Sequence, residues 1–263
     1  MPAQELEGTK SPRSDVAERA SRNYNQVAEI CKKHNIKKIF IKNTGDTLCR
    51  LCEKEKMEEE NQKTVDQLAV DFEEGKRKYF LKQFSMMDET IRNASFDNFE
   101  ISTDEEKRAL QFAKEKARHW AKGGRNNIIL QGDVGVGKSH LAHSILQAVS
   151  DYNKKIGIFV NVTILLNKIK SDINNREWYI RKLTEADYLV LDDLGTEMTT
   201  DWVREILYDI VNMRFNTIFT TNLTYDEIQK RYSKPFLSRM MKGVNEEQIF
   251  KFKSDKNKRI THF

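Results

Sequence analysis

Residues 132–139 read GDVGVGKS, a complete G-x-x-x-x-G-K-S phosphate-binding loop. The apolar run at 127–131 precedes the loop and predicts a buried strand, and an amphipathic helical pattern follows it. The glycines let consecutive backbone N–H groups converge on phosphate oxygens, and the helix directs its positive end at the anion. The sequence therefore predicts a nucleoside triphosphate site. Its predicted nucleotide ligands are Gly132, Asp133, Val134, Gly135, Val136, Gly137, Lys138, Ser139, His140 and Asp192.

Within this loop two side chains have separate roles. Lys138 is expected to reach the β- and γ-phosphates, and Ser139 is expected to hold Mg²⁺. No guanine-reading signature is present, so ATP is the expected nucleotide.

Residues 188–193 form an apolar strand pattern that ends in two carboxylates. Asp192 is expected to orient Mg²⁺ through its water shell, and Asp193 to polarise the attacking water. Asp193 is one methylene shorter than the Glu that many such ATPases carry, so slow hydrolysis is expected. The alternative is that both aspartates only cap a turn before Leu194 and Gly195.

A third strand pattern at 217–221 ends at Asn222. In P-loop ATPases with a strand inserted between the two Walker strands, a polar residue at this point senses the γ-phosphate. Asn222 is therefore a predicted catalytic residue, together with Asp193.

The composition limits the classes of protein that need considering. The chain has 263 residues, of which 32% are charged, and no apolar stretch approaches the roughly 20 residues of a membrane helix. Its beginning lacks a signal-peptide core, so we expect no membrane partner and a cytoplasmic location. The net charge of +5 does not by itself indicate nucleic-acid binding, and the basic tail at 251–263 either contacts phosphate or is merely solvated.

All three cysteines lie in one short segment. Cys31-x-x-His34 is followed by Cys49-x-x-Cys52, which gives two ligand pairs at the spacing of a structural zinc site. Residues 36–46 are expected to form a hairpin between the pairs. The alternative is three reduced thiols and an unrelated histidine.

The pattern divides the chain into three parts: a zinc-binding module at 1–55, a helical linker at 56–95 and an ATPase domain at 96–263. Residues 1–25 are polar and are expected to fray. The linker is charged and helix-prone, and either docks a partner or folds onto its own domain. A helix is expected over 104–119, followed by a break at Gly123 and Gly124.

From about Phe96 onward the chain resembles the DnaC/DnaI-type loaders of bacterial replicative helicases, which are AAA+ ATPases. The resemblance rests on five segments, at 132–141, 190–197, 207–214, 220–223 and 237–240. It implies an α/β fold in which helices flank a parallel central sheet, with the strand before Asn222 between the Walker strands. It also implies that Arg239 acts as an arginine finger across a subunit boundary, with Arg231 as the competing candidate. Lys256 and Arg259 are only weak candidates for a second sensor.

The resemblance further implies an ATP-dependent loader that places a replicative hexameric DNA helicase on single-stranded DNA and self-associates through its ATPase interface. The N-terminal module, which resembles a zinc ribbon, is similar to that of Gram-positive and phage loaders, where it grips the helicase. Residues 162–184 match an inserted helix of this clade. Its expected apolar face comprises Leu165, Leu166, Ile169 and Ile173, and Lys168 and Lys170 are expected near DNA.

Other functions remain open at this point. A helper ATPase of an insertion-sequence transposase shares the same core, and a non-catalytic ATP-dependent DNA-binding adaptor would need only nucleotide binding. A small-molecule P-loop kinase is disfavoured because no substrate-base pocket can be identified.

Overall fold

The computed structural model describes residues 23–212 and 214–253, and the contacts among them divide the chain into two compact units. The first unit runs to Asp71 and the second begins at Phe72. The predicted fraying of residues 1–25 is wrong at Tyr24 and Asn25, which lie in a strand, and its part up to residue 22 lies outside the described residues. The candidates Lys256 and Arg259 also lie outside the described residues, and the domain limits at 55 and 95 stay a prediction.

The first unit contains a three-stranded antiparallel sheet in the order β1-β2-β3. The strands are β1 (Tyr24–Ile30), β2 (Lys37–Ile41) and β3 (Thr47–Leu48). Gly45 takes the left-handed φ of 75° in the turn between β2 and β3, where a side chain would be strained. The expected hairpin is therefore present, and β1 extends it. Helix α2 (Arg50–Phe84) begins directly after β3 and continues into the second unit.

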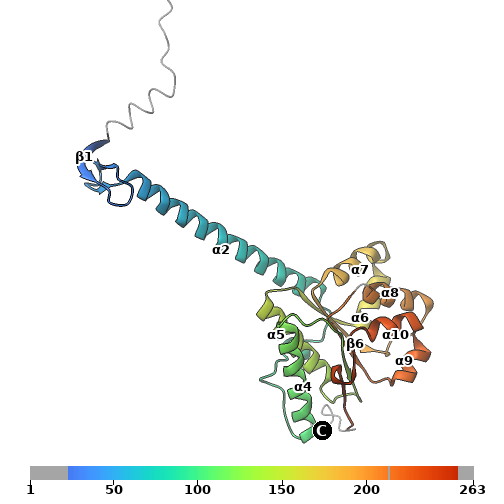
Figure 1. The fold of residues 1–263 in the computed structure, drawn as a ribbon. Coiled ribbons are helices and arrows are strands. Elements are labelled where there is room, and N and C mark those ends of the chain that lie inside the picture. The colour runs from blue at the N-terminus through green and yellow to red at the C-terminus, as the bar shows by residue number, and fades with distance from the viewer. Residues whose placement is uncertain (1–22, 213, 254–263) are drawn as a thin grey trace, which may run out of the picture. The chain divides into compact units, whose positions relative to one another are not determined.

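The second unit is built on a parallel sheet of five strands in the order β5-β6-β7-β4-β8 (Figure 1). In chain order the strands are β4 (Ile128–Gln131), β5 (Gly157–Asn161), β6 (Tyr188–Leu194), β7 (Thr217–Thr221) and β8 (Ile249–Lys251). Strand β7 lies between the two Walker strands β4 and β6, so the predicted AAA+ arrangement is confirmed. Strand β8 had not been predicted.

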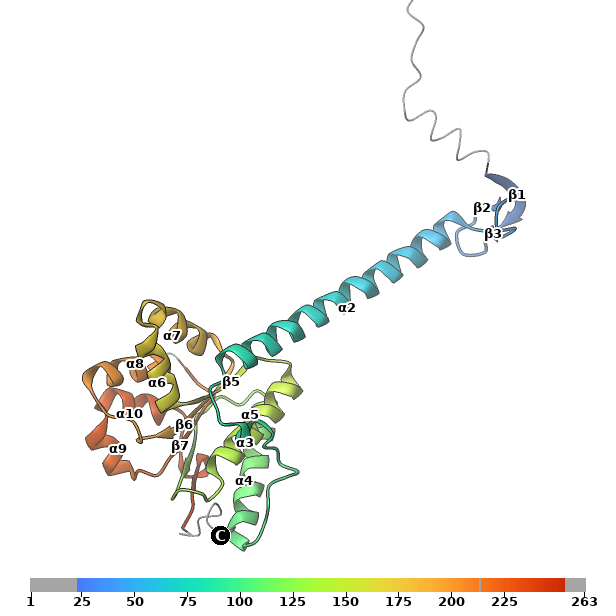
Figure 2. The same ribbon diagram turned by 180° about the vertical axis from the view of Figure 1, so that it is seen from behind.

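Helices cover both faces of this sheet (Figures 1 and 2). Helices α4 and α5 pack together over one face, and α6 and α8 pack over the other. Among the described residues, no helix is both long and apolar enough to cross a membrane. The helices of this unit after α2 are α3 (Glu89–Arg92), α4 (Asp104–Ala121), α5 (Lys138–Asn153), α6 (Val162–Ser171), α7 (Arg176–Glu185), α8 (Asp201–Asn212), α9 (Tyr225–Arg231) and α10 (Lys234–Met240), with 3₁₀ turns at Ile173–Asn175 and Glu246–Gln248.

Successive residues of each strand enter opposite cores. Ile128 and Leu130 pack with α4 and α5, whereas Ile129 packs in the core on the other face. Because helices cover both faces of the sheet, the central strands appear in the sequence as continuous apolar runs and not as alternating apolar and polar residues.

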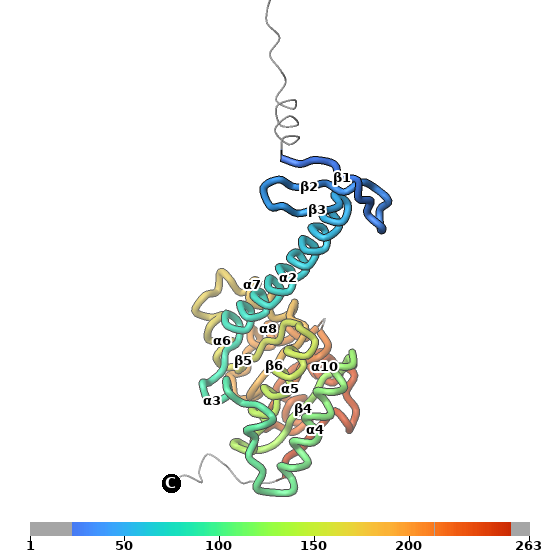
Figure 3. Tube along the Cα trace, turned by 90° about the vertical axis from the view of Figure 1, so that its left-hand side faces the viewer, coloured from blue at the N-terminus to red at the C-terminus, as the bar shows by residue number. Residues whose placement is uncertain are grey.

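The chain passes from the end of α2 to α3 within the second unit (Figure 3), and Phe84, the last residue of α2, belongs to the core of that unit. Phe84 is only 1% exposed, and its ring lies 4.9 Å from that of Trp178. Beyond the helix, the N–H of Met86 donates to the carbonyl of Phe159 at 2.7 Å, and the N–H of Asn161 donates back to Met86 at 2.8 Å. These bonds attach the chain to the edge of β5 before it reaches the phosphate-binding loop.

The inserted segment differs from the expected single helix in one respect. Leu165, Leu166 and Ile169 are buried on α6, but Ile173 is 53% exposed. Ile173 lies in the 3₁₀ turn that separates α6 from α7, so it has left the helical register and the expected apolar face ends at Ile169. Lys168 and Lys170 are exposed on α6.

Candidate functional site

The phosphate-binding loop connects β4 to the first turn of α5. Gly135 and Gly137 adopt left-handed φ angles of 86° and 95°. A Cβ on Gly137 would lie 2.8 Å from the ring of Phe99, so a larger residue is excluded at this position. The loop therefore needs glycine both for its backbone conformation and for its packing.

Lys138 is buried, with only 6% of its surface exposed, and its ammonium group lies against the phosphate-binding loop. Its Nζ donates to the carbonyl oxygens of Gly132 and Asp133, both at 2.7 Å. Side-chain position and burial thus place a cation at the point where the phosphates of a nucleotide would enter.

Asp192 lies beneath the loop near the end of β6 and is 4% exposed. Its Oδ1 accepts a hydrogen bond from the Thr220 hydroxyl at 2.7 Å. Burial and, to a smaller extent, the Asp193 carboxylate raise the pKa of Asp192 to about 6, against the opposing effect of hydrogen bonds from Thr220 and Ser139 and of the charge of Lys138. The two predicted magnesium ligands, Ser139 and Asp192, therefore lie close enough to interact.

Asp193 lies in a β-bulge, where the register of β6 against β7 shifts between Leu191 and Leu194. Its φ of 56° is left-handed, and its N–H donates to the Thr220 hydroxyl at 2.8 Å. The amide of Asn161 donates to its Oδ2 at 3.2 Å. Through the bulge, two consecutive aspartates take separate positions, one beneath the loop and one in the cavity beside it.

A cavity of about 290 Å³ unites most of the predicted residues. Asp193 and Asn222 line it together with the phosphate-binding loop. Sequence reasoning missed Thr90 and Ile91, which also line it and belong to no motif, and it assigned no role to Thr196, which lines the cavity from the 190–197 segment. The lining contributed by the loop and the start of α5 is Val134, Gly135, Gly137, Lys138, Ser139 and His140.

Two histidines of α5 hold the segment before α4 against this site. The Nε2 atom of His140 lies 2.8 Å from the carbonyl oxygen of Ser95, and Nδ1 of His143 lies 2.8 Å from that of Ala94. Burial lowers the pKa of His143, so the neutral ring is favoured there. His140 therefore contacts both the cavity and the chain that closes it.

The structure does not bring Arg239 into the cavity of its own chain. Arg239 lies on α10, and its Nε donates to Asn212 Oδ1 at 2.9 Å. The competing candidate, Arg231, donates to the carbonyl of Glu197, whose carboxylate accepts from Tyr232. Arg231 is thus engaged within its own chain, and Arg239 is half-buried at a distance from the cavity lining.

A second cluster lies in the first unit, where one ligand atom from each of Cys31, His34, Cys49 and Cys52 falls within 4.8 Å of the others. Sγ of Cys52 is 3.3 Å from Nδ1 of His34 and 3.6 Å from Sγ of Cys31. Tetrahedral zinc with Zn–S of roughly 2.3 Å and Zn–N of about 2.0 Å requires donor separations of about 3.5–3.8 Å. The four side chains fit such an ion closely.

Glu55 contacts this cluster from the first turns of α2. Its Oε1 accepts from Nε2 of His34 at 3.0 Å, which leaves Nδ1 facing the sulfur atoms. A carboxylate in this position fixes the tautomer that a metal-binding histidine needs. No sequence pattern indicates Glu55, because its hydrogen bond to His34 depends on where α2 begins.

Comparison with known proteins places this site in a family. The sequence profile of the IstB-like ATP binding proteins matches residues 52–243. The chain belongs to the IstB-like ATP-binding family. The matched range includes both Walker strands and the strand between them, and ATP binding is the property that the family description states.

Individual relatives are helicase loaders. The replicative helicase loader DnaC of Buchnera aphidicola subsp. Baizongia pistaciae is 28% identical over 167 residues, which are 59% of this chain and 66% of that protein. DnaC of Escherichia coli K12 is 25% identical over 171 residues, which are 62% of this chain and 69% of that protein. The match thus leaves about a third of each loader's length uncovered. The expected resemblance to DnaC-type loaders is confirmed.

Solved structures agree on the fold. The crystal structure of the DnaC helicase loader superposes with a TM-score of 0.52 at 25% identity, covering 62% of this chain and all of that one. AMPPCP-bound DnaA from Aquifex aeolicus, at 18% identity, gives a TM-score of 0.53 over 65% of this chain and 54% of that one. At that identity the likeness to DnaA supports the fold alone.

Proposed function

We propose that this chain is an ATP-dependent loader that places a hexameric replicative helicase on single-stranded DNA at the initiation of replication. The observation that carries the proposal is a complete phosphate-binding site in a chain whose sequence and fold match DnaC helicase loaders. Those relatives are named as replicative helicase loaders, and we propose the same role for this chain.

At the nucleotide site, Lys138 holds the β- and γ-phosphates, and Ser139 and Asp192 hold Mg²⁺. The metal neutralises charge on the transferring phosphoryl group. Burial of Asp192 disfavours its carboxylate charge, so a cation binding beside it relieves a cost that the folded chain carries. The same residues therefore fit a magnesium nucleotide on electrostatic grounds.

Asp193 and Asn222 face the phosphate region from the ends of β6 and β7. Asp193 positions the attacking water, and Asn222 detects the γ-phosphate. Asp193 is also held by Asn161, which competes for its carboxylate and supports slow turnover. Hydrolysis then acts as a switch between two states of the loader.

Arg239 completes the site of a neighbouring copy. Its position outside the cavity of its own chain supports a role across a subunit boundary. The hydrogen bond from its Nε to Asn212, at the end of α8, holds the side chain of Arg239 in place on α10. Self-association through the ATPase interface is part of the proposal, because a finger from another subunit supplies charge that this site lacks.

The Cys31, His34, Cys49 and Cys52 cluster binds zinc and gives the 1–55 module its fold. We assign helicase contact to this module, a helical linker role to 56–95 and the ATPase to 96–263. The donor separations and the Glu55 contact support zinc over unrelated reduced thiols.

A second candidate is a helper ATPase of an insertion-sequence transposase, because the matching family is described as IstB-like. Co-elution separates the two functions. Full-length protein is mixed with a purified replicative helicase hexamer, or with an IS21-type transposase, and each mixture is run through size exclusion with ATP. Co-elution with the helicase alone is expected. Co-elution with the transposase alone would replace the loader by the helper ATPase.

A further inference from the structure

A groove of about 480 Å³ runs between α4 and α5, away from the nucleotide cavity. Lys114 and Arg118 line it from α4, Lys122 lines it from the C-cap position that follows α4, and Tyr152 lines it from the last turn of α5. Phe96 and the carboxylate Asp97 contribute from the segment before α4, so the lining carries three cations and one anion. The groove belongs entirely to the second unit and shares no residue with the cavity around the phosphate-binding loop.

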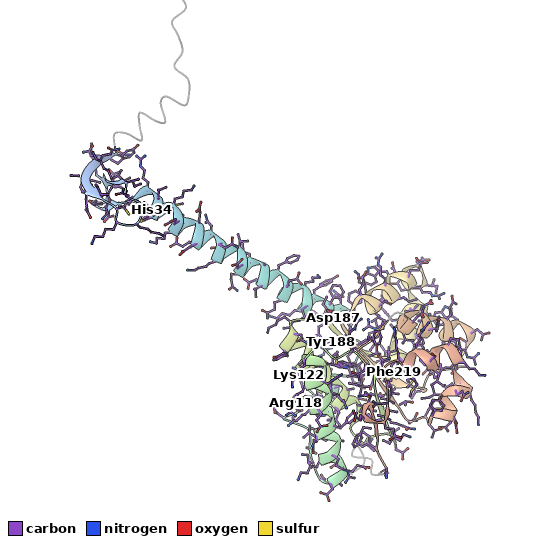
Figure 4. All side chains as sticks on the ribbon, viewed as in Figure 1. His34, Arg118, Lys122, Asp187, Tyr188 and Phe219 are labelled. Carbon is purple, nitrogen blue, oxygen red and sulfur yellow. The ribbon has the colours of Figure 1, made fainter. Side chains whose placement is uncertain are left out.

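Because the three cations recur every fourth residue, Lys114 and Arg118 share one face of α4 and Lys122 continues that row at the C-cap. Arg118 and Lys122 are exposed, and they follow one another along the helix (Figure 4). Four residues of helix rise about 6 Å, which is comparable to the separation of neighbouring phosphates in an extended single strand. Within the described ranges 23–212 and 214–253, no carboxylate lies in ion-pair distance of Lys114, Arg118 or Lys122.

The aromatic residues of the groove stand next to these cations. Tyr152 is 74% exposed, which is unusual for a large ring that packing alone would bury. The Lys114 ammonium lies 5.9 Å from the centre of the Phe96 ring. An exposed ring beside a row of unpaired cations is the combination that binds bases by stacking and backbone phosphates by charge.

We propose that the groove between α4 and α5 binds single-stranded nucleic acid, with phosphates along Lys114, Arg118 and Lys122 and a base on Tyr152. This inference rests on the proposed loader function for its biological meaning, but its geometry is independent of the nucleotide site. It assigns the strand to α4 and α5 rather than to Lys168 and Lys170 on α6. An acidic protein segment would pair with the cations but would leave Tyr152 without a stacking partner.

The test compares full-length variants of equal charge by fluorescence anisotropy with labelled oligo-dT. Arg118→Glu/Lys122→Glu alters the groove, and Arg108→Glu/Lys116→Glu on another face of α4 is the matched control. Lys168→Glu/Lys170→Glu examines α6. The groove pair is expected to weaken binding at least tenfold more than the control pair. Its slope of log affinity against log salt should be smaller by about 1.4, since two phosphate contacts at roughly 0.7 each are lost.

Tyr152→Ala tests stacking separately. It should weaken oligo-dT binding about fivefold or more, from the lower limit for a stacked base. Binding of an abasic strand with the same number of phosphates should stay unchanged. Thermal unfolding and ATP binding, measured on every variant, should match wild type because none of these side chains is in the core or the nucleotide cavity.

Equal losses in the groove and control pairs would overturn the inference, as would a loss confined to the α6 pair or wild-type protein that binds no oligo-dT. Normal oligo-dT binding with lost helicase co-elution would make the groove a protein-docking surface. The proposed function fails separately: a wild-type chain that binds oligo-dT through this groove yet does not co-elute with helicase would leave the inference standing without the loader.

Discussion

At the residue scale, the ammonium of Lys138 donates to two carbonyls of its own loop and is expected to face phosphate oxygens when nucleotide is bound. Lys138→Ala removes charge-assisted hydrogen bonds worth about 1.5–3 kcal/mol, so ATP affinity should fall about 10- to 150-fold. Isothermal calorimetry measures this. Lys155→Ala is the control, because Lys155 pairs with Asp187 beyond the other end of α5. Equal affinities in the two variants would remove Lys138 from the site.

His143 makes stability depend on pH. Burial lowers its pKa below the ordinary value of 6.5, so the unfolded chain binds the proton more readily than the folded chain. Its contribution to the free energy of unfolding is therefore complete above about pH 6.5 and is lost as the pH falls below that value. His143→Asn should reduce the loss, which denaturant titrations between about pH 7 and pH 5 would record. If the pH dependence of the free energy of unfolding is unchanged in His143→Asn, groups other than His143 cause that dependence.

The residues of the nucleotide site were predictable where a motif fixed them and unpredictable where pairing between strands fixed them. The loop and Asp192 follow from residue types in a strand–loop–helix context. The left-handed backbone of Asp193 follows instead from the bulge against β7 and from Thr220, which no local pattern reveals. Thr90 and Ile91 reach the cavity only because residues 85–94 attach to β5 and α5.

At the scale of elements, Glu55 links the start of α2 to the Cys/His cluster. Glu55→Ala should weaken zinc binding roughly 10- to 100-fold, because His34 loses the carboxylate that orients its ring. Competition with a chromophoric chelator measures the affinity. Glu58→Ala is the matched control, since Glu58 pairs with Lys54 on the helix surface at 3.7 Å. If neither the wild-type protein nor any variant binds zinc, the cluster consists of three reduced thiols and a histidine that binds no metal.

The elements that the sequence predicted are those with a strong internal pattern. The hairpin of β2 and β3 and helix α4 were expected, and α4 starts where a capping box of Thr103 and Glu106 satisfies its first N–H groups. Strand β1 was missed because most of its residues are exposed and show no alternation. Strand β8 has three residues, too few to carry a period, and exists because β4 offers it a free edge.

At the scale of the whole molecule, the position of Arg239 predicts that hydrolysis needs an assembly. Lys138→Ala and Arg239→Ala proteins should each hydrolyse ATP poorly, and mixing them should restore activity. Each mixed interface can pair an intact loop with an intact finger, and a finger is worth about 10³ or more in rate. Phosphate release measured over a range of mixing ratios checks this. Activity that stays at the level of the single variants under conditions of assembly would place Arg239 outside the site.

The most direct test of the ATP-dependent loader is helicase transfer onto a closed circular single strand, which has no free end for a ring to thread. Full-length protein with ATP should increase the helicase bound to circles, measured by co-sedimentation, whereas Lys138→Ala should leave it at the level of helicase alone. Loading that is the same with wild-type protein, with Lys138→Ala and with no added protein would contradict the account.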